Sequence, residues 1–203
     1  MSSGDISYPL MEHFFTVQGE GFHTGKSAYF LRLGGCDVGC VWCDVKESWD
    51  AAVHPHSTVS FMVDQVLQAG AVRVVVTGGE PCMYDLQPLT DALHNAGLEC
   101  FLETSGAYPI SGTWDWICVS PKKFKGPIAA ALRRANELKV VIYNRHDFDW
   151  AESHARVVSA DCRLYLQPEY SVLEKILPLV IEYVKGHPFW TISLQTHKVM
   201  QIP

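Results

Sequence analysis

Three cysteines stand close together in a glycine-broken segment of the chain: Cys36, Cys40 and Cys43. Thiolates are the usual ligands of iron–sulfur clusters, and a four-iron cluster has four ligand positions. Three nearby thiolates therefore leave one iron open to bind and orient another molecule. Gly35 and Gly39 allow backbone turns there that a β-carbon would block. The residue types and their spacing predict an iron–sulfur centre with one open coordination position.

Two other interpretations of these thiols stay open. A structural zinc site needs a fourth ligand, which His54 or His56 could supply, since sites with three cysteines and one histidine are common. Zinc loops, however, usually show paired two-residue spacings, which this segment lacks. The three thiols could also be unrelated buried side chains. Burial as free thiols is the preferred interpretation for the cysteines without metal-ligand spacing, Cys82, Cys100, Cys118 and Cys162.

Apolar strands and amphipathic helices alternate along most of the chain. Continuous apolar runs, such as 74–76 and 139–142, are typical of parallel strands that are covered on both faces. Strands are predicted at 28–33, 73–77, 99–103, 116–120, 138–142, 163–167 and 191–194, and helices at 59–69, 86–96, 128–135, 147–159 and 172–185. Residues 1–203 are therefore expected to form one α/β domain, an open or partial barrel. Loops at the carboxyl ends of its strands would carry the chemistry.

The overall composition argues against several classes of protein. The 203-residue chain is 48% hydrophobic and 19% charged, which suits a folded domain with a sizeable core. Its net charge of -6 argues against a nucleic-acid partner, because such binding depends on clustered Lys and Arg. No secretory signal is recognisable, and no apolar stretch reaches the ~20 residues that cross a bilayer. We therefore expect a cytoplasmic protein with no membrane partner and with reduced cysteines.

The spacing Cys36-x3-Cys40-x2-Cys43 resembles the cluster loop of the radical S-adenosylmethionine superfamily. A second segment agrees with it, since the sequence GGEP at 78–81 directly follows the predicted strand 73–77. The resemblance implies a partial, open TIM-like barrel, a [4Fe–4S] cluster on the three cysteines and S-adenosylmethionine as the second cofactor. In that superfamily, reductive cleavage of S-adenosylmethionine provides a 5′-deoxyadenosyl radical.

Over its whole length the chain resembles the family of 7-carboxy-7-deazaguanine synthases, which act in queuosine and deazapurine biosynthesis. The segments that carry the resemblance are VQGEGFHTG at 17–25, FLRLGGC at 30–36 and an apolar tail that ends in proline. The resemblance implies conversion of 6-carboxy-5,6,7,8-tetrahydropterin to 7-carboxy-7-deazaguanine with loss of ammonia. It assigns substrate contacts to Val17, Gln18, Gly19, Glu20, Arg32, Thr77, His197 and Pro203.

Contacts with S-adenosylmethionine are implied at the ends of successive predicted strands. A Ser or Thr that closes a strand offers hydroxyl and backbone groups suited to a ribose or a carboxylate. A carboxylate beside exposed backbone carbonyls suits an ammonium group. The residues that the resemblance assigns to this cofactor are Gly79, Glu80, Glu103, Thr104, Ser120, Pro121, Lys122, Gln167, Pro168, Glu169 and Tyr170.

The same resemblance implies a homodimer, a flavodoxin-type electron donor and a magnesium ion. In the family, a Thr or Ser hydroxyl two residues beyond the last cluster cysteine holds the magnesium, whereas this chain has Val45 there. Valine offers no oxygen ligand for Mg²⁺. Asp44, a water molecule or the charge of Lys46 could take over, or the ion could be dispensable. A glycyl-radical activating enzyme, the rival within the superfamily, shares the cysteine loop but does not predict the 17–25 segment.

Overall fold

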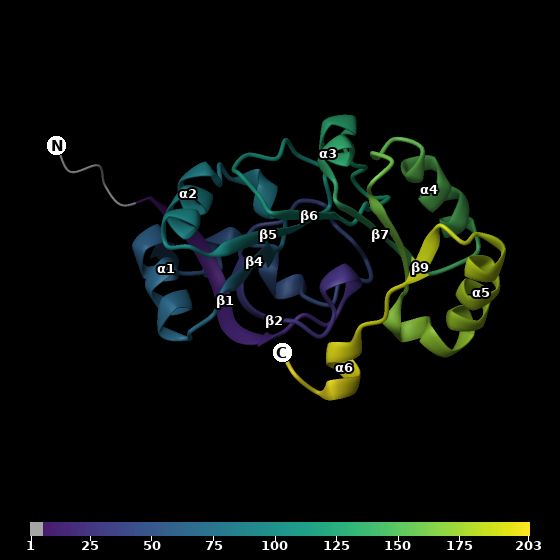
Figure 1. Cartoon of the computed structure of the whole chain (residues 1–203), viewed down its shortest axis with the longest axis horizontal. Coiled ribbons are helices and arrows are strands. Elements are labelled where there is room, and N and C mark those ends of the chain that lie inside the picture. Colours follow the sequence, from purple (N-terminus) through teal and green to yellow (C-terminus); the bar gives the residue numbers. More distant parts are fainter. Residues whose placement is uncertain (1–5) are drawn as a thin grey trace.

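One curved sheet, with the strand order β3-β1-β2-β4-β5-β6-β7-β8-β9, forms the centre of the computed structural model, which describes residues 6–203 (Figure 1). From β2 to β9 each neighbouring pair is parallel, whereas β1 runs antiparallel to both β2 and β3. Because β3 and β9 form the two edges, the sheet stays open, as the sequence predicted. The strands are β1 (Ser7–Val17), β2 (Ser27–Leu33), β3 (His56–Thr58), β4 (Arg73–Gly78), β5 (Glu99–Thr104), β6 (Trp116–Val119), β7 (Glu137–Ile142), β8 (Arg163–Pro168) and β9 (Trp190–Ile192).

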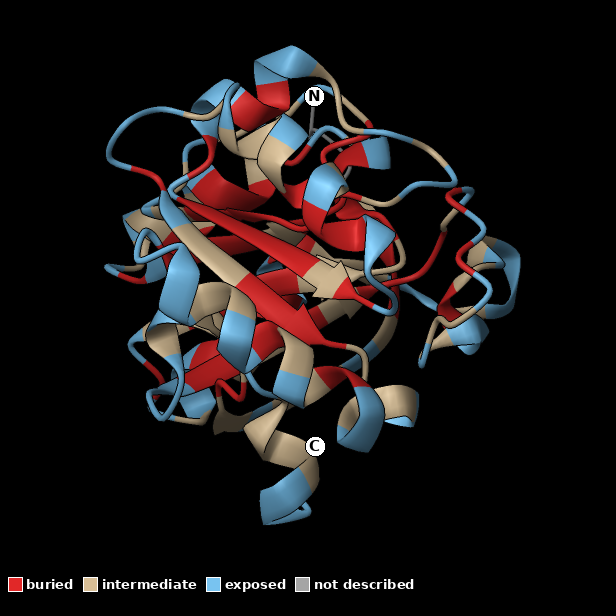
Figure 2. Ribbon diagram, turned by 90° about the vertical axis from the view of Figure 1, so that its right-hand side faces the viewer, coloured by how far each residue is buried: buried red, intermediate tan, exposed pale blue. Residues whose placement is uncertain are grey.

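Helices follow most of the parallel strands and cover the outer face of the sheet (Figure 1). At the start of α1 (Val59–Gln68), the Thr58 hydroxyl accepts a hydrogen bond from the Phe61 N–H at 3.2 Å and so caps the helix. Val59, Met62 and Val66 recur at helical spacing on its buried face. Figure 2 shows the result, with buried strands inside and exposed helix surfaces outside. The helices are α1 (Val59–Gln68), α2 (Gln87–Asn95), α3 (Ala129–Arg134), α4 (His146–Ala155), α5 (Leu173–Gly186) and α6 (Thr196–Met200).

Every predicted strand and helix is present, and most of their ends agree within two residues. The predicted helix 147–159 ends earlier, at Ala155, because the N–H groups of Val157 and Val158 both turn back to the His154 carbonyl. The sequence prediction missed β1, β3 and α6. Segment 46–58, which it left unplaced, forms two short 3-10 turns (Lys46–Ser48 and Ala51–Val53) and then β3.

Four cysteines predicted to be free and buried are both, namely Cys82, Cys100, Cys118 and Cys162. The main core lies between the sheet and the helices that cover it. Within the described part of the chain, no helix combines the length and the apolar character needed to cross a membrane.

Candidate active site

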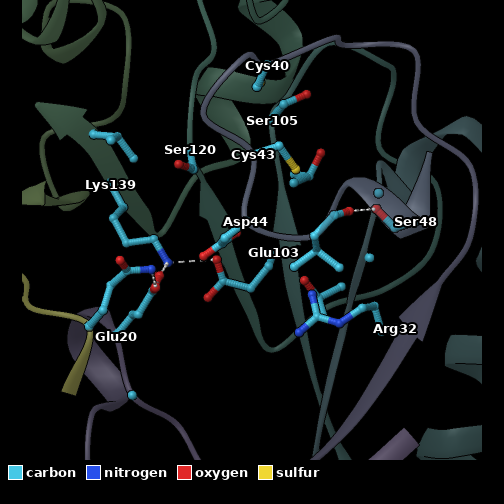
Figure 3. A pocket seen from close by; sticks show the side chains of 18 of the residues that line it. Glu20, Arg32, Cys40, Cys43, Asp44, Ser48, Glu103, Ser105, Ser120 and Lys139 are labelled. Carbon is cyan, nitrogen blue, oxygen red and sulfur yellow. Dashed lines mark hydrogen bonds and ion pairs between the residues drawn. The ribbon is translucent and has the colours of Figure 1, made fainter. Parts of the chain in front are cut away.

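A cavity of about 290 Å³ opens at the carboxyl ends of the parallel strands (Figure 3). Its wall joins the turn after β1, the cysteine loop after β2, the ends of β4 to β8 and the tail around α6. Four predicted site residues do not line it: Glu80, Pro121, Pro168 and Tyr170. The predicted site residues on the wall are Val17, Gln18, Gly19, Glu20, Arg32, Cys36, Cys40, Cys43, Thr77, Gly79, Glu103, Thr104, Ser120, Lys122, Gln167, Glu169, His197 and Pro203.

The cysteine loop and the GGEP segment are built against each other. The Glu80 N–H donates to the Gly35 carbonyl at 2.8 Å, and the Gly79 N–H donates to the Leu33 carbonyl at 3.0 Å. A β-carbon at Gly79 would lie 2.3 Å from the Gly35 carbonyl oxygen, so only glycine permits this approach. The Cys36 N–H also donates to the Trp49 carbonyl at 3.0 Å. Backbone contacts on both sides thus hold the loop at the cavity.

The spacing of the cavity thiols suits a cluster better than a single zinc ion. With Zn–S bonds of ~2.3 Å, tetrahedral zinc would bring its sulfur ligands to about 3.8 Å from one another. Among residues 6–203, the ligand atoms that gather in threes within 4.8 Å of one another are those of His94, Cys100 and Asp115, so at least one pair of the cavity sulfurs lies further apart than 4.8 Å. His54 and His56 hydrogen-bond elsewhere and lie off the cavity wall. The donor set fits an iron–sulfur cluster.

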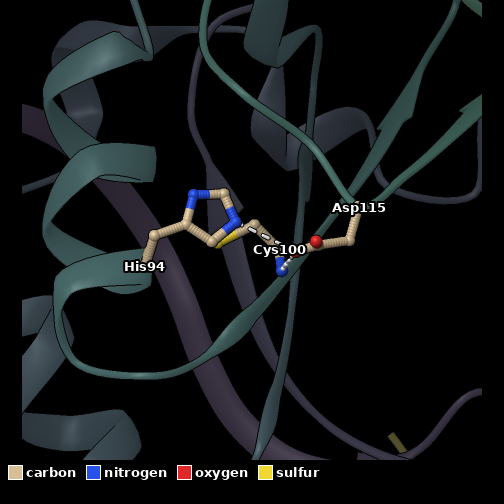
Figure 4. Close-up of side chains that lie close together, drawn as sticks. All are labelled: His94, Cys100 and Asp115. Atoms are coloured by element: carbon tan, nitrogen blue, oxygen red, sulfur yellow. Dashed lines mark hydrogen bonds and ion pairs between the residues drawn. The ribbon is translucent and has the colours of Figure 1, made fainter.

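Figure 4 shows His94, Cys100 and Asp115 close together. Cys100 stands near the start of β5, whereas the cavity lies at the other end of that strand. One oxygen of Asp115, Oδ2, accepts the Cys100 N–H at 2.7 Å and lies 2.9 Å from His94 Nε2. Burial raises the pKa of the Cys100 thiol to about 12, so the sulfur keeps its proton. Asp115 Oδ2 is thus already occupied by hydrogen bonds within the protein, and these bonds link α2 to the start of β5.

A charged triad forms the floor of the cavity. The ammonium of Lys139 lies 2.6 Å from Glu20 Oε2 and 3.0 Å from Glu103 Oε2 (Figure 3). Burial acts to raise the pKa of Glu20, but the charge of Lys139 and the hydrogen bonds from Lys139 and Gln195 together outweigh it, and the pKa falls to about 2. Burial likewise acts to lower the pKa of Lys139, yet the neighbouring acidic groups raise it well above its usual value. Lys139, only 4% exposed, therefore carries a permanent buried charge.

Glu80 lies behind the cavity wall and is 1% exposed. Its carboxylate accepts hydrogen bonds from Thr104 Oγ1 at 2.5 Å, the Ser105 N–H at 2.8 Å and the Cys82 N–H at 3.0 Å. These bonds tie the GGEP turn to the end of β5. The structure thus shows Glu80 as a link between two strand ends, and its contact with a cofactor stays a prediction.

The tail around α6 bridges two parts of the cavity mouth. The Thr196 N–H and Oγ1 both donate to the Gly19 carbonyl at 2.9 Å. Lys198 Nζ lies 3.1 Å from Asp44 Oδ2, in the cysteine loop. His197 packs so closely on Gly19 that a β-carbon there would lie 2.4 Å from its Nδ1. These contacts bring His197 and the last residue of the chain onto the wall.

Two further basic side chains reach the wall. Arg32 Nε lies 2.6 Å from Glu12 Oε1, an ion pair within the β1–β2 ladder. Lys122 Nζ donates to Ser120 Oγ at 2.5 Å and lies 5.5 Å from the ring centre of Trp42. Burial lowers the pKa of Lys122. Arg32 at β2 and Lys122 after β6 thus give the cavity wall two basic groups that can attract anions.

Several wall residues were not among the predicted cluster, cofactor and substrate residues. Lys139 could have been predicted from the sequence, because a single charged residue in an otherwise apolar predicted strand requires a buried partner. The others lie within or beside the recognised motifs, as Gly78 and Asp44 do, in segments that local patterns did not place, or at apolar positions with no chemical signature. The full set is Phe14, Phe30, Val38, Trp42, Asp44, Val45, Ser48, Trp49, Gly78, Ser105, Lys139, Val141, Gln195 and Lys198.

Curated relatives named 7-carboxy-7-deazaguanine synthase match the chain over nearly its whole length. One from Flavobacterium psychrophilum is 53% identical over 195 residues, which are 96% of this chain and 92% of the relative. One from Synechocystis sp. is 51% identical over 197 residues, with 97% and 94% covered. The crystal structure of QueE from Escherichia coli has a TM-score of 0.82 and 33% identity, with 93% of each chain covered. No family model matches the chain.

The open parallel sheet and the three thiols beside the GGEP turn define the chain as a radical S-adenosylmethionine enzyme. The identity to the relatives, which extends far beyond the cysteine loop, narrows this class. The chain belongs to the 7-carboxy-7-deazaguanine synthase family.

Proposed function

We propose that this chain converts 6-carboxy-5,6,7,8-tetrahydropterin to 7-carboxy-7-deazaguanine with loss of ammonia. The observation that carries the proposal is the joining, in one cavity, of three thiols and the charged floor of Glu20, Lys139 and Glu103. The relatives are named 7-carboxy-7-deazaguanine synthase, which supports the product. Queuosine or deazapurine biosynthesis is the proposed setting.

The floor and Arg32 can orient a pterin between them. Glu20, with a pKa of about 2, is ionised at neutral pH and can accept hydrogen bonds from the N–H edge of a guanine-like ring. Arg32 can pair with the substrate carboxylate, because its guanidinium presents a fork of donors at every relevant pH. Figure 3 shows Glu20 and Arg32 on different sides of Glu103, a separation that suits the two ends of one substrate.

Cys36, Cys40 and Cys43 would hold the [4Fe–4S] cluster. When bound, the cluster and S-adenosylmethionine supply the radical that takes a hydrogen atom from the substrate. Polar residues from strand ends, Ser120 and Gln167 among them, line the same cavity as the thiols and can bind the ribose and carboxylate of the cofactor. Aromatic side chains on the same wall exclude water from the reacting groups.

Anaerobic reconstitution with iron and sulfide tests this function and its rivals. We expect about four irons per chain and a brown protein, with ammonia released only when pterin, S-adenosylmethionine and a reductant are all present. A colourless protein with stoichiometric zinc would contradict the cluster and favour a zinc module. A loaded cluster that leaves the pterin unchanged, but produces a glycyl radical on a protein substrate, would favour an activating enzyme.

A magnesium ion does not fit the residues around Val45. Val45 lines the cavity without an oxygen ligand, the Ser48 hydroxyl donates to the Val45 carbonyl at 2.7 Å, and Asp44 pairs with Lys198. The cation beside Asp44 is thus Lys198, and Lys46 lies off the cavity wall. We therefore expect turnover to be unchanged after exhaustive chelation of Mg²⁺ and unchanged when Mg²⁺ is restored. A Mg²⁺ requirement in the product assay would show that another ligand set exists.

Deletion of Pro203 tests the role of the tail. The last residue lies on the cavity wall, and its fixed φ lowers the entropy lost when its carboxylate is positioned. We expect the truncated enzyme to have a KM for the pterin raised about tenfold, a loss of roughly 1.4 kcal/mol in binding, with iron content unchanged. Pro203→Ala keeps a terminal carboxylate at the same position and should lie between the two. An unchanged KM in both would exclude the tail from substrate binding.

A homodimer and a low-potential flavodoxin-type electron donor complete the proposal. Exposed apolar side chains on β1 and α1 support a contact surface between copies, including Phe15 at 48% exposure and Phe61, whose ring lies against His13 two residues from Phe15 on β1. Light scattering should give twice the mass of the chain, and this value should fall towards that of one chain in a Phe15→Glu, Phe61→Glu variant. A wild-type protein of single-chain mass would contradict the dimer.

A further inference from the structure

A second group of buried polar atoms lies one layer below the floor of the cavity. Glu137 starts β7 two residues before Lys139, so both side chains project from the same face of the strand. Glu137 is 3% exposed, and its Oε2 accepts the Phe22 N–H at 3.2 Å and the Trp116 Nε1–H at 3.0 Å. Its Oε1 is buried without a hydrogen-bond partner among residues 6–203. Such an atom is costly unless a water or an added proton satisfies it.

A second unpartnered atom borders the same space. His23 Nε2 is also buried without a partner among the described residues. His23 and Glu137 both line a small cavity with about 10 Å³ of room for the centre of a water-sized sphere. One water needs about that volume and two to four polar partners. The polar wall, which also includes Gln18, Glu20 and Glu103, supplies them.

This buried site supports the segment from Gln18 to Phe22. A β-carbon at Gly21 would lie 1.9 Å from Glu137 Oε1, and Gly21 has φ +65°, so the segment can rest on Glu137 only with glycine there. The Gly21 N–H donates to Ser193 Oγ at 2.9 Å, which fixes the other side. Glu20, directly before this glycine, is the carboxylate at the cavity floor. The position of Glu137 therefore sets the position of Glu20.

The charges around Glu137 are unbalanced. Lys139 already pairs with Glu20 and Glu103, so no ammonium is left to pair with Glu137 alone. Burial raises the pKa of Glu137 to about 7, and burial lowers the pKa of His23 to about 4, so the imidazole stays neutral. The titratable and charged groups that face or influence Glu137 are Glu20, His23, Glu103, Cys118, Lys139, Cys162, Arg163 and Tyr165.

We propose that Glu137, His23 and one buried water form a protonatable support beneath the Gln18–Phe22 segment, and that Glu137 is thereby a positioning residue for the pterin. The neutral carboxyl holds the segment without adding charge. After losing its proton, Glu137 competes with Glu20 for Lys139 and loosens the grip of Glu20 on the substrate. The inference rests on the proposed function for the identity of the substrate, but the support itself does not.

Glu137→Gln separates this role from a purely structural one. The amide keeps an acceptor for Phe22 and a donor for the water, and it is neutral at every pH. In the wild type we expect the KM for the pterin to rise about tenfold between about pH 6 and pH 8.5, with kcat changed less than about twofold. Glu137→Gln should keep the low KM throughout, while Glu174→Gln, on exposed α5, should follow the wild type. Parallel KM profiles in wild type and Glu137→Gln would overturn the proposal.

Thermal unfolding of the reconstituted enzyme tests the support without turnover. A carboxyl with a raised folded-state pKa binds more protons folded than unfolded, so the wild type loses stability as the pH rises from about 4.3 to about 7. From about pH 4.3 to about pH 7, the Tm difference between Glu137→Gln and the wild type should therefore shift in favour of the variant. Above about pH 7 this difference should stay constant. An offset independent of pH would overturn the support, even in an enzyme that makes the expected product.

If Glu137→Gln does not fold, infrared spectra of the wild type decide the matter. A protonated carboxyl band present near pH 6 and lost by about pH 8.5 is expected, and its absence would overturn the proposal. If the proposed function alone is wrong, the wild type makes no deazaguanine, but the Tm difference between Glu137→Gln and the wild type still depends on pH.

Discussion

Replacement of Lys139 by methionine should reduce pterin turnover at least a hundredfold while leaving the iron content unchanged. The ammonium is 2.6 Å from Glu20 and 3.0 Å from Glu103, and both carboxylates line the cavity. Without it, the two buried acids repel each other or take up protons, and Glu20 can no longer act as a fixed acceptor. Removing one partner from a buried ion pair costs about 3–5 kcal/mol, so the free energy of unfolding should fall by a comparable amount.

Turnover, iron content and urea unfolding measured on one preparation would separate these effects. Lys175→Met, on the exposed side of α5, is the matched control and should behave as the wild type. The double variant Lys139→Met, Glu103→Gln should regain part of the stability, because one unpaired charge is gone, but not the turnover. Turnover near the wild-type value in Lys139→Met would show that the charged floor is not needed for the reaction.

Replacement of Cys40 by alanine should abolish cluster binding and, with it, turnover. Cys40 lines the cavity, whereas Cys162 lies in the core at the start of β8, yet both are 8% exposed. This pair is matched in residue type and burial and differs in location alone. Without Cys40, only two thiolates remain to hold the cluster, and thiolates are its protein ligands, so the cluster is no longer held by three bonds to the protein. Cys162→Ala should keep about four irons per chain and lose only folding stability, because it merely leaves a small cavity.

Iron and sulfide analysis with the absorbance spectrum is the measurement for both cysteine variants. A Cys40→Ala protein with full iron content and turnover would contradict the assignment of the cluster loop. Loss of iron from Cys162→Ala, in a protein that still unfolds cooperatively, would mean that the metal centre lies elsewhere.

Most strands and helices could be predicted because buried parallel strands leave continuous apolar runs, and helices between them repeat their apolar positions at helical spacing. The missed elements lack those signals. Strand β1 contains Pro9, which cannot donate a ladder hydrogen bond, and β1 is antiparallel rather than part of the repeating unit. Strand β3 and helix α6 are short, and contacts with distant segments define them.

The site could be predicted as far as its residues lie in local motifs at strand ends. Partnerships across the chain could not. The charge of Lys139 in an otherwise apolar run indicates a buried partner, but no local pattern shows that its partners lie on β5 and in the turn after β1. The pairing of Lys198 with Asp44 joins positions 154 residues apart, and no local pattern encodes it. Glu80 illustrates the converse: its motif identifies the turn, but not that hydrogen bonds within the protein already occupy the carboxylate.

Mass-spectrometric identification of the product tests the proposed reaction. The anaerobically reconstituted enzyme is incubated with 6-carboxy-5,6,7,8-tetrahydropterin, S-adenosylmethionine and a low-potential reductant. We expect 7-carboxy-7-deazaguanine, formed only when all three are present and absent with Cys40→Ala. Recovery of unchanged pterin from an enzyme that carries its full cluster would contradict the proposed reaction.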